Sequence, residues 1–210
     1  GVMFLQGGPL RQAKFTNHLQ SYSTVPLLIA IDAEWGVAMR LDSCFRFPWQ
    51  MTLGAINDTS LIYDMGVEVA RQCKLLGIHV NFSPVVDVNS NPKNPIINNR
   101  SFGENPVKVG RMGVAYMLGM QDNNIIACAK HFPGHGDTDT DSHKTLPIIK
   151  HSRDRLERVE FMPFKKLINN GLGSIMVAHL SVPSLDKSKN LAATLSPVVV
   201  NGLLKKEMSF

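Results

Sequence analysis

The strongest constraint on the fold is the alternation of short apolar runs with longer segments that have helical spacing. Five runs are predicted to be buried strands: residues 2–5, 27–31, 78–82, 125–129 and 174–178. Strands that alternate with helices form parallel β-α units. The sequence therefore predicts an α/β protein with a parallel sheet.

Helices are expected between these runs, at residues 10–22, 60–76, 106–121 and 152–170 and in a last segment opened by Ser196–Pro197. Pro106 suits the first turn of a helix, and Ser152 suits a cap. Pro163 is expected to break or kink the fourth helix. The buried face of the second helix is predicted to contain Leu61, Met65, Val69, Leu75 and Leu76.

Polar residues after several strands narrow the choice of fold. A dinucleotide-binding sheet needs a glycine-rich phosphate loop after an early strand, and residues 6–9 (QGGP) are not one. Polar groups instead follow four runs: Asp32 and Glu34, residues 87–100, residues 131–143, and His179. This distribution is typical of a TIM-like (β/α)8 barrel, which takes about 250 residues and cannot close with five strands. We expect residues 1–210 to form a single barrel domain, truncated at both ends.

Composition excludes several classes of protein. Apolar residues make up 44% of the chain and charged residues 19%, which is typical of a folded globular protein. The net charge is +5, but no run of five or more basic residues predicts binding to nucleic acid. No apolar run approaches the roughly 18–20 residues of a membrane span. Three widely spaced cysteines exclude a disulfide scaffold and a CxxC zinc module.

The densest group of reactive side chains lies in residues 130–147, directly after the fourth run. This segment contains His131, His135, His143, Asp137, Asp139 and Asp141. A polar surface loop is the simplest interpretation. A metal site is a second, because aspartate and histidine are metal ligands, although no HExxH motif is present.

Acid/base catalysis is the third interpretation of this segment. Asp141 and His143 are two residues apart, so in an extended segment their side chains lie on one side. An aspartate that accepts a hydrogen bond from one imidazole nitrogen fixes the tautomer. The other nitrogen is then free to give or take a proton.

Several motifs together resemble the NagZ-type β-N-acetylglucosaminidases of glycoside hydrolase family three. They are IDAEWG (31–36), GIHVNFSPVVDV (77–88), RSFGENP (100–106), KHFPGHGDT with DSH (130–143), MVAHLSVP (176–183) and ATLSPVVVNGLL (193–204). The resemblance covers essentially the whole chain. It implies the catalytic N-terminal barrel domain of a retaining exo-glycosidase. Such an enzyme removes terminal β-linked N-acetylglucosamine from peptidoglycan or chitin fragments.

The resemblance also implies roles for individual residues. Binding of the sugar is implied for Asp32, Arg100, Lys130, His131 and His179. His143 would be the general acid/base and Asp141 its partner. The family's nucleophile is an aspartate expected downstream of Phe210, so this fragment alone is expected to be inactive. No metal or cofactor is implied, and Asp87 would shape a loop rather than attack the sugar.

Residue by residue, simpler interpretations stay open at the sequence level. Asp32 could be a helix cap, Arg100 a free surface side chain, and His179 a core histidine. The asparagine-rich stretch 87–105 favours turns over direct contact with sugar.

One departure from the family pattern concerns Trp35, which stands near the expected pocket where the common DxEGG motif has glycine. This resembles a branch found in Bacteroidetes, in which a domain similar to a serine β-lactamase often follows the barrel. The expected partner is an oligosaccharide or muropeptide that contains N-acetylglucosamine, and neither nucleic acid nor a membrane span is expected. The bacterial periplasm or cell envelope is favoured as the compartment, with the cytoplasm left open.

Rival functions also stay open. They are a family-three β-glucosidase or β-xylosidase, a non-catalytic carbohydrate-binding barrel and a metal-dependent hydrolase. Neither the choice between hydrolysis and phosphorolysis nor the choice between chitin and cell-wall fragments follows from the sequence.

Overall fold

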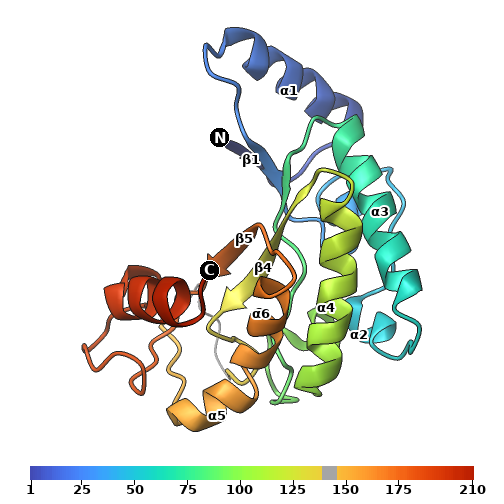
Figure 1. Cartoon of the computed structure of the whole chain (residues 1–210). Coiled ribbons are helices and arrows are strands. Elements are labelled where there is room, and N and C mark those ends of the chain that lie inside the picture. Colours follow the sequence, from blue (N-terminus) through green and yellow to red (C-terminus); the bar gives the residue numbers. More distant parts are fainter. Residues whose placement is uncertain (139–145) are drawn as a thin grey trace.

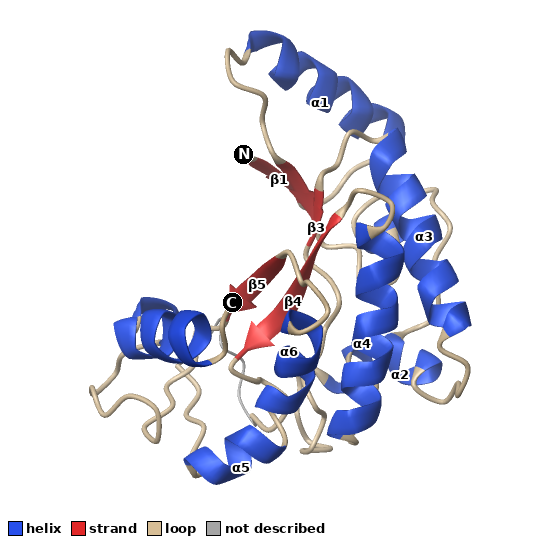
Figure 2. Ribbon diagram, in the orientation of Figure 1, coloured by secondary structure: helices blue, strands red, loops and turns tan. Residues whose placement is uncertain are grey.

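The computed structural model describes residues 1–138 and 146–210, and its framework is one five-stranded parallel sheet. The strand order follows the chain: β1 (Val2–Phe4), β2 (Ile29–Ile31), β3 (Val80–Asn81), β4 (Ile126–Phe132) and β5 (Ser174–Val177). Each strand pairs in parallel with the next, and helical segments connect them (Figure 2). All five predicted strands are present, and all five carboxyl ends lie at one edge of the sheet.

The helices that follow the central strands form a layer beside the sheet (Figure 1). The helices are α1 (Pro9–Tyr22), the short α2 (Gln50–Leu53), α3 (Ser60–Leu75), α4 (Pro106–Gln121), α5 (Arg153–Arg158) and α6 (Phe161–Ile168). Short 3₁₀ segments are η1 (Val37–Met39), η2 (Asn98–Arg100) and η3 (Ala193–Leu195), and a π-helix, η4 (Val198–Glu207), comes last. In Figure 1, α1 lies apart from the layer that α3, α4 and α6 form.

Two glycines let α3 and α4 approach closely. A Cβ on Gly119 would lie 2.2 Å from the carbonyl oxygen of Tyr63, and a Cβ on Gly66 would lie 2.6 Å from that of Tyr116. Any larger residue would force the helices apart. The close contact helps to bury Tyr116 and Met117, which lie in the core between helices and sheet.

The helix predictions need two corrections. In α3, Leu61 and Leu75 are exposed, and the buried face is formed by Ile62, Met65, Gly66, Val69, Ala70 and Cys73. The apolar stripe follows a spacing of three and four residues that starts at Ile62 rather than Leu61.

The segment expected after Ser152 is two helices, and the break lies at residues 159–160 rather than at Pro163. Pro163 instead lies in the first turn of α6, where its missing N–H costs no helical hydrogen bond. The predicted cap at Ser152 is present, because its hydroxyl accepts from the Arg155 amide. The last helix begins after Ser196–Pro197 as expected, and the Ser196 hydroxyl accepts from the Val199 amide. Within the described ranges, no helix is both long and apolar enough to cross a bilayer.

Candidate active site

A cavity of about 490 Å³ opens at the carboxyl ends of β2, β4 and β5. Its polar lining consists of Asp32, Arg40, Arg100, Lys130, His131, His135 and His179. Met39, Ile96, Met176, Val177 and Ala178 supply the apolar part. The sequence-selected residues thus meet although they lie as many as 99 positions apart (131 − 32). They meet because parallel strands deliver their carboxyl ends to the same edge.

Four ion-paired residues form what we call the charged wall of this cavity: Asp32, Glu34, Arg100 and Lys130. Lys130, near the end of β4, is its centre. Its side chain is only 2% exposed, and its Nζ donates to Asp32 Oδ1 at 2.8 Å and lies 2.7 Å from Glu34 Oε1. A buried ammonium without partners would be costly, and the two carboxylates supply them. The lysine is therefore held as a fixed cation.

Glu34 links Lys130 to Arg100 and is fully buried. Arg100 binds it through two bonds, from Nε to Oε2 at 2.9 Å and from Nη2 to Oε1 at 2.7 Å. Burial would raise the pKa of Glu34, but Lys130 and Arg100 outweigh it and lower that pKa to about 2. Arg100 is thus part of the site rather than a free surface side chain.

Asp32 faces the cavity from the other side of Lys130. Its second oxygen forms an ion pair with Arg40, so Asp32 is not a helix cap. Burial would raise the pKa of Asp32, but Lys130 and Arg40 outweigh it and lower that pKa. Arg40 was not predicted as a site residue from the sequence. Its position only eight residues after Asp32, in the same loop, was the available signal.

The turn that contains Asp32 and Glu34 is fixed by neighbouring buried groups. Asn81 Oδ1 accepts from the Ala33 amide at 2.9 Å, and the Tyr116 hydroxyl donates to the Ala33 carbonyl at 3.1 Å. These bonds attach the turn to β3 and α4. The two carboxylates therefore have little freedom to move away from Lys130.

Asp87 and His131 form a second polar centre beside the charged wall. His131 Nδ1 lies 2.7 Å from Asp87 Oδ2, and the His135 amide donates to Asp87 Oδ1 at 2.7 Å. Burial lowers the pKa of His131, and the opposing effect of Asp87 does not reverse this. The lowered pKa favours the neutral form of the ring, and Arg100 Nη2 lies 3.4 Å from its Nε2.

The loops 87–100 and 131–138 are joined backbone to backbone. A Cβ on Gly136 would lie 1.8 Å from the Val88 carbonyl oxygen. The Asn94 side chain donates to the His135 carbonyl at 2.7 Å and to Thr138 Oγ1 at 3.3 Å. Asn94 thus contributes to this site by fixing the neighbouring loop rather than by lining the cavity.

The remaining predicted residues differ in their placement. His179 is exposed at the cavity rim, and its Nδ1 lies 2.9 Å from Thr194 Oγ1, so it is not a core histidine. His135, not given a role from sequence, is buried, and its Nε2 has no partner among the described residues. Asp141 and His143 lie outside the described residues.

Trp35, which departs from the family pattern, is not among the residues that line the cavity. Its ring lies 4.1 Å from that of Trp49, and the Arg46 guanidinium lies over both rings. The tryptophan therefore packs within its own loop. Over residues 1–138 and 146–210 there is no cluster of three or more His, Cys, Asp or Glu suited to a metal ion.

Comparison with known proteins decides the family. Residues 6–210 match the family model for the glycosyl hydrolase family 3 N-terminal domain. The chain belongs to this family. Its five parallel strands with their helices are an incomplete TIM-like barrel, as the sequence predicts.

The individual relatives agree with this assignment. The chain is 40% identical over 206 residues to beta-hexosaminidase A of Pseudoalteromonas piscicida, covering 91% of this chain and 34% of that protein. It is 32% identical over 209 residues to a beta-hexosaminidase of Nitrosomonas eutropha, covering 96% of this chain and 59% of that protein. The chain thus spans between about a third and three-fifths of these relatives.

Solved structures show the same likeness. A family 3 β-N-acetylglucosaminidase from a Paenibacillus species superposes with a TM-score of 0.94 at 40% identity, covering all of this chain and 41% of that one. NagZ from Neisseria gonorrhoeae, solved with N-trifluoroacetyl-D-glucosamine, superposes with a TM-score of 0.91 at 30% identity, covering all of this chain and 64% of that one.

Proposed function

We propose that this chain forms the sugar-binding part of a retaining exo-β-N-acetylglucosaminidase. The observation that carries the proposal is the convergence of Asp32, Arg100, Lys130 and His131 on one cavity. Asp32 supplies acceptor oxygens for hydroxyl groups, while Lys130 and Arg100 supply N–H donors. Their mutual ion pairs hold these groups in place before a sugar arrives, which reduces the ordering cost of binding.

The proposed reaction needs two further groups. A carboxylate attacks the anomeric carbon while an acid protonates the leaving oxygen, and water later releases the sugar from the enzyme. We assign the acid to His143 and its orientation to Asp141, from the sequence pattern. The nucleophile is proposed to follow Phe210 in the full-length gene product.

The substrate is proposed to be a peptidoglycan or chitin fragment with a terminal β-linked N-acetylglucosamine. Support comes from the names of the relatives, which are beta-hexosaminidases, and from a solved relative bound to an N-acylated glucosamine. A location in the periplasm or cell envelope and a following domain similar to a serine β-lactamase belong to the same proposal.

The test is turnover of two β-N-acetylglucosaminides by the full-length gene product, one with an activated aryl leaving group and one with an alkyl leaving group. His143→Ala is expected to slow the alkyl substrate by about 10²–10⁴-fold and the aryl substrate much less, because only the poor leaving group needs a proton. Asp141→Ala should show the same pattern more mildly. His18→Ala, on the outer face of α1, is the matched control.

Two results would count against this assignment. Equal losses for both leaving groups in His143→Ala would remove His143 as the acid. Sugar binding without turnover by the full-length wild type would favour the non-catalytic carbohydrate-binding barrel.

Phosphorolysis of a β-glucoside is a second candidate, because the solved β-glucoside phosphorylase BglX superposes with a TM-score of 0.95 at 27% identity. Another relative, from Cellulomonas fimi, is named a beta-N-acetylglucosaminidase/beta-glucosidase. Parallel assays with β-glucosides, with and without inorganic phosphate, separate these activities. Release of a sugar phosphate rather than free sugar would establish phosphorolysis.

A further inference from the structure

Asp87 is a fully buried carboxylate for which the proposed reaction has no direct use. Three N–H groups converge on it. The backbone amides of His131 and His135 lie 3.2 Å and 2.7 Å from its oxygens, and the His131 ring Nδ1 lies 2.7 Å away. Burial would raise the pKa of Asp87, but His131 and His135 outweigh it and lower that pKa. The group is therefore an ionised, acceptor-only carboxylate.

The two edges of the His131 ring are constrained independently. An ionised carboxylate can only accept, so Nδ1 facing Asp87 must carry a proton. At the other edge, Arg100 Nη2 lies 3.4 Å from Nε2, and a guanidinium can only donate. An N–H at Nε2 would therefore oppose another N–H. Both contacts select the same neutral tautomer, with the proton on Nδ1 and a lone pair on Nε2.

We propose that Asp87 is a positioning residue that makes His131 Nε2 an obligate hydrogen-bond acceptor, so that the pocket selects a sugar with a hydroxyl donor at that point. His131 and Arg100 both line the cavity. A hydroxyl that approaches this pair from the cavity can donate to Nε2 and accept from the guanidinium. Fluorine at the same ring position cannot donate, so it cannot replace the hydroxyl.

A merely structural Asp87 would hold the loop without setting the polarity of Nε2. In that case the tautomer would have no effect on which analogues bind, and loss of the carboxylate would weaken all substrates alike. The identity of the sugar rests on the proposed function, whereas the tautomer does not. The two ideas can therefore fail separately.

The first experiment reads the imidazole nitrogen chemical shifts of the full-length protein labelled in its histidine rings. The His131 signals are assigned by their loss in His131→Asn. We expect a protonated Nδ1 and an unprotonated Nε2, unchanged between about pH 6 and pH 8, where an ordinary histidine titrates. A proton on Nε2 in this range would overturn the proposal, whether or not the protein turns over any substrate.

The second experiment measures a series of substrates in which each sugar hydroxyl in turn is replaced by fluorine. For one ring position, the wild type should lose about tenfold in kcat/KM, the equivalent of one hydrogen bond. In Asp87→Asn, KM for the parent sugar should rise by about tenfold with a smaller change in kcat. The loss of kcat/KM caused by fluorine at that position (the fluorine penalty) should largely disappear.

Asp122→Asn is the matched control, because Asp122 receives a hydrogen bond from Tyr63 at the far end of α4 and has no hydrogen bond to a histidine among the described residues. It should keep the wild-type fluorine penalty. A full penalty retained in Asp87→Asn would overturn the proposal. If Asp87→Asn does not fold, the wild-type tautomer and the wild-type fluorine series still decide it. Absence of turnover by the wild type counts against the proposed function, and the tautomer measurement remains decisive for Asp87.

Discussion

The charged wall of the cavity and the β1–α1 edge of the sheet differ in whether their buried polar groups have partners. At the wall, Lys130 and Glu34 are buried, and each is paired with oppositely charged groups. On α1, the side-chain amide of Gln12 and the hydroxyl of Thr16 are also buried, but neither has a partner among the described residues. The outer face of α1 exposes large apolar side chains, among them Leu10, Phe15 and Tyr22.

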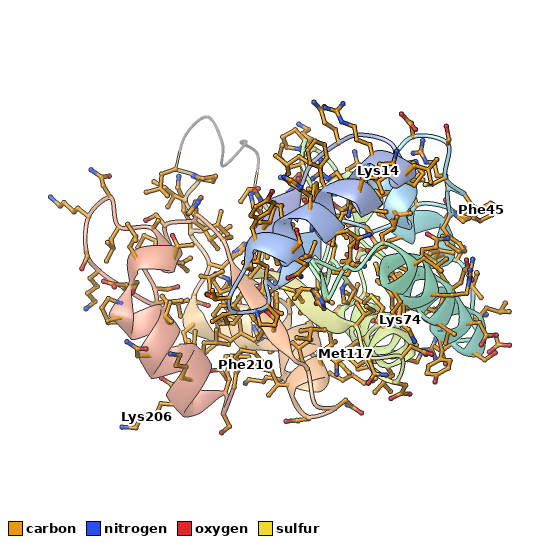
Figure 3. All side chains as sticks on the ribbon, turned by 90° about the horizontal axis from the view of Figure 1, so that it is seen from above. Lys14, Phe45, Lys74, Met117, Lys206 and Phe210 are labelled. Atoms are coloured by element: carbon orange, nitrogen blue, oxygen red, sulfur yellow. The ribbon has the colours of Figure 1, made fainter. Side chains whose placement is uncertain are left out.

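The difference shows which region is held in place by many interactions and which is not. An unpaired buried polar group costs about 1–3 kcal/mol, whereas a paired one fixes its neighbours. Lys14 projects from α1 on the solvent side, while Met117 of α4 lies among packed side chains (Figure 3). We therefore expect the cavity wall to be rigid and the β1–α1 edge to open first.

The largest expected effect is on the cavity wall. Glu34→Ala leaves Lys130 and Arg100 without their shared carboxylate and should lower the free energy of unfolding by about 3–5 kcal/mol. Glu68→Ala, which breaks the exposed pair with Arg71, should cost no more than about 1 kcal/mol. Denaturant unfolding measures both. Similar losses for the two variants would mean that the buried pairs are not special.

Acid provides the second test. The folded pKa of Glu34, about 2, lies below its ordinary value of 4.5, so its contribution is complete above about pH 4.5 and is lost as the pH falls toward 2. The loss should be on the order of 3 kcal/mol in this window. Glu34→Gln should flatten this part of the stability profile, whereas Gln12→Leu should leave its slope unchanged. A wild-type profile that is flat below pH 4.5 would contradict the depressed pKa.

Hydrogen exchange should separate the two regions directly. Amides in the middle of α3 and α4 should exchange only on global unfolding, because those helices pack closely at Gly66 and Gly119. Amides of α1 should open at a free energy lower by about 2 kcal/mol or more. Equal protection in α1 and α4 would show that the edge is as cooperative as the core.

The smallest expected effect comes from two glutamines on one helix. Gln12→Leu removes an unpaired buried amide and should raise the free energy of unfolding by about 1 kcal/mol. Gln20→Leu should lower it by a similar amount, because Gln20 exchanges two hydrogen bonds of 2.9 Å with the Leu27 backbone. Thermal or denaturant unfolding of the pair checks the opposite signs. Destabilisation by both changes would mean that Gln12 has a partner in solution.

Much of the architecture could be predicted from the sequence because it depends on local patterns. The strand runs, the helix starts at Pro106 and after Ser196–Pro197, and the cap at Ser152 are short-range signals. The break between α5 and α6 was predicted at the wrong residue. The sequence alone does not distinguish a proline in the first turn of a helix from a proline in a helix interior. On α3, Met65 and Val69 were correctly predicted to be buried, but Leu61 was not, because the choice between Leu61 and Ile62 is made by packing against α4.

The site was less accessible to sequence reasoning. Asp32, Arg100, Lys130 and His131 were found through motifs, and Glu34 was noted beside Asp32, but the ion pairs among these residues were not predicted. Glu34 carries no sign in the sequence that it bridges two cations, because Arg100 is 66 positions away and the contact exists only after the sheet forms. Arg40 was missed although it lies only eight residues after Asp32, because no motif marks the pairing of these two side chains.

The contact between Gly136 and Val88 has a consequence for the exchange of loops between related enzymes. With no space for even one methyl group between the two backbones, and with Asn94 bonded across the junction, residues 87–100 and 131–138 form a single unit of substitution. A chimera in which only one of the two loops is exchanged would have mismatched contacts between them. Transfer of sugar preference between family members therefore requires both segments to be moved together.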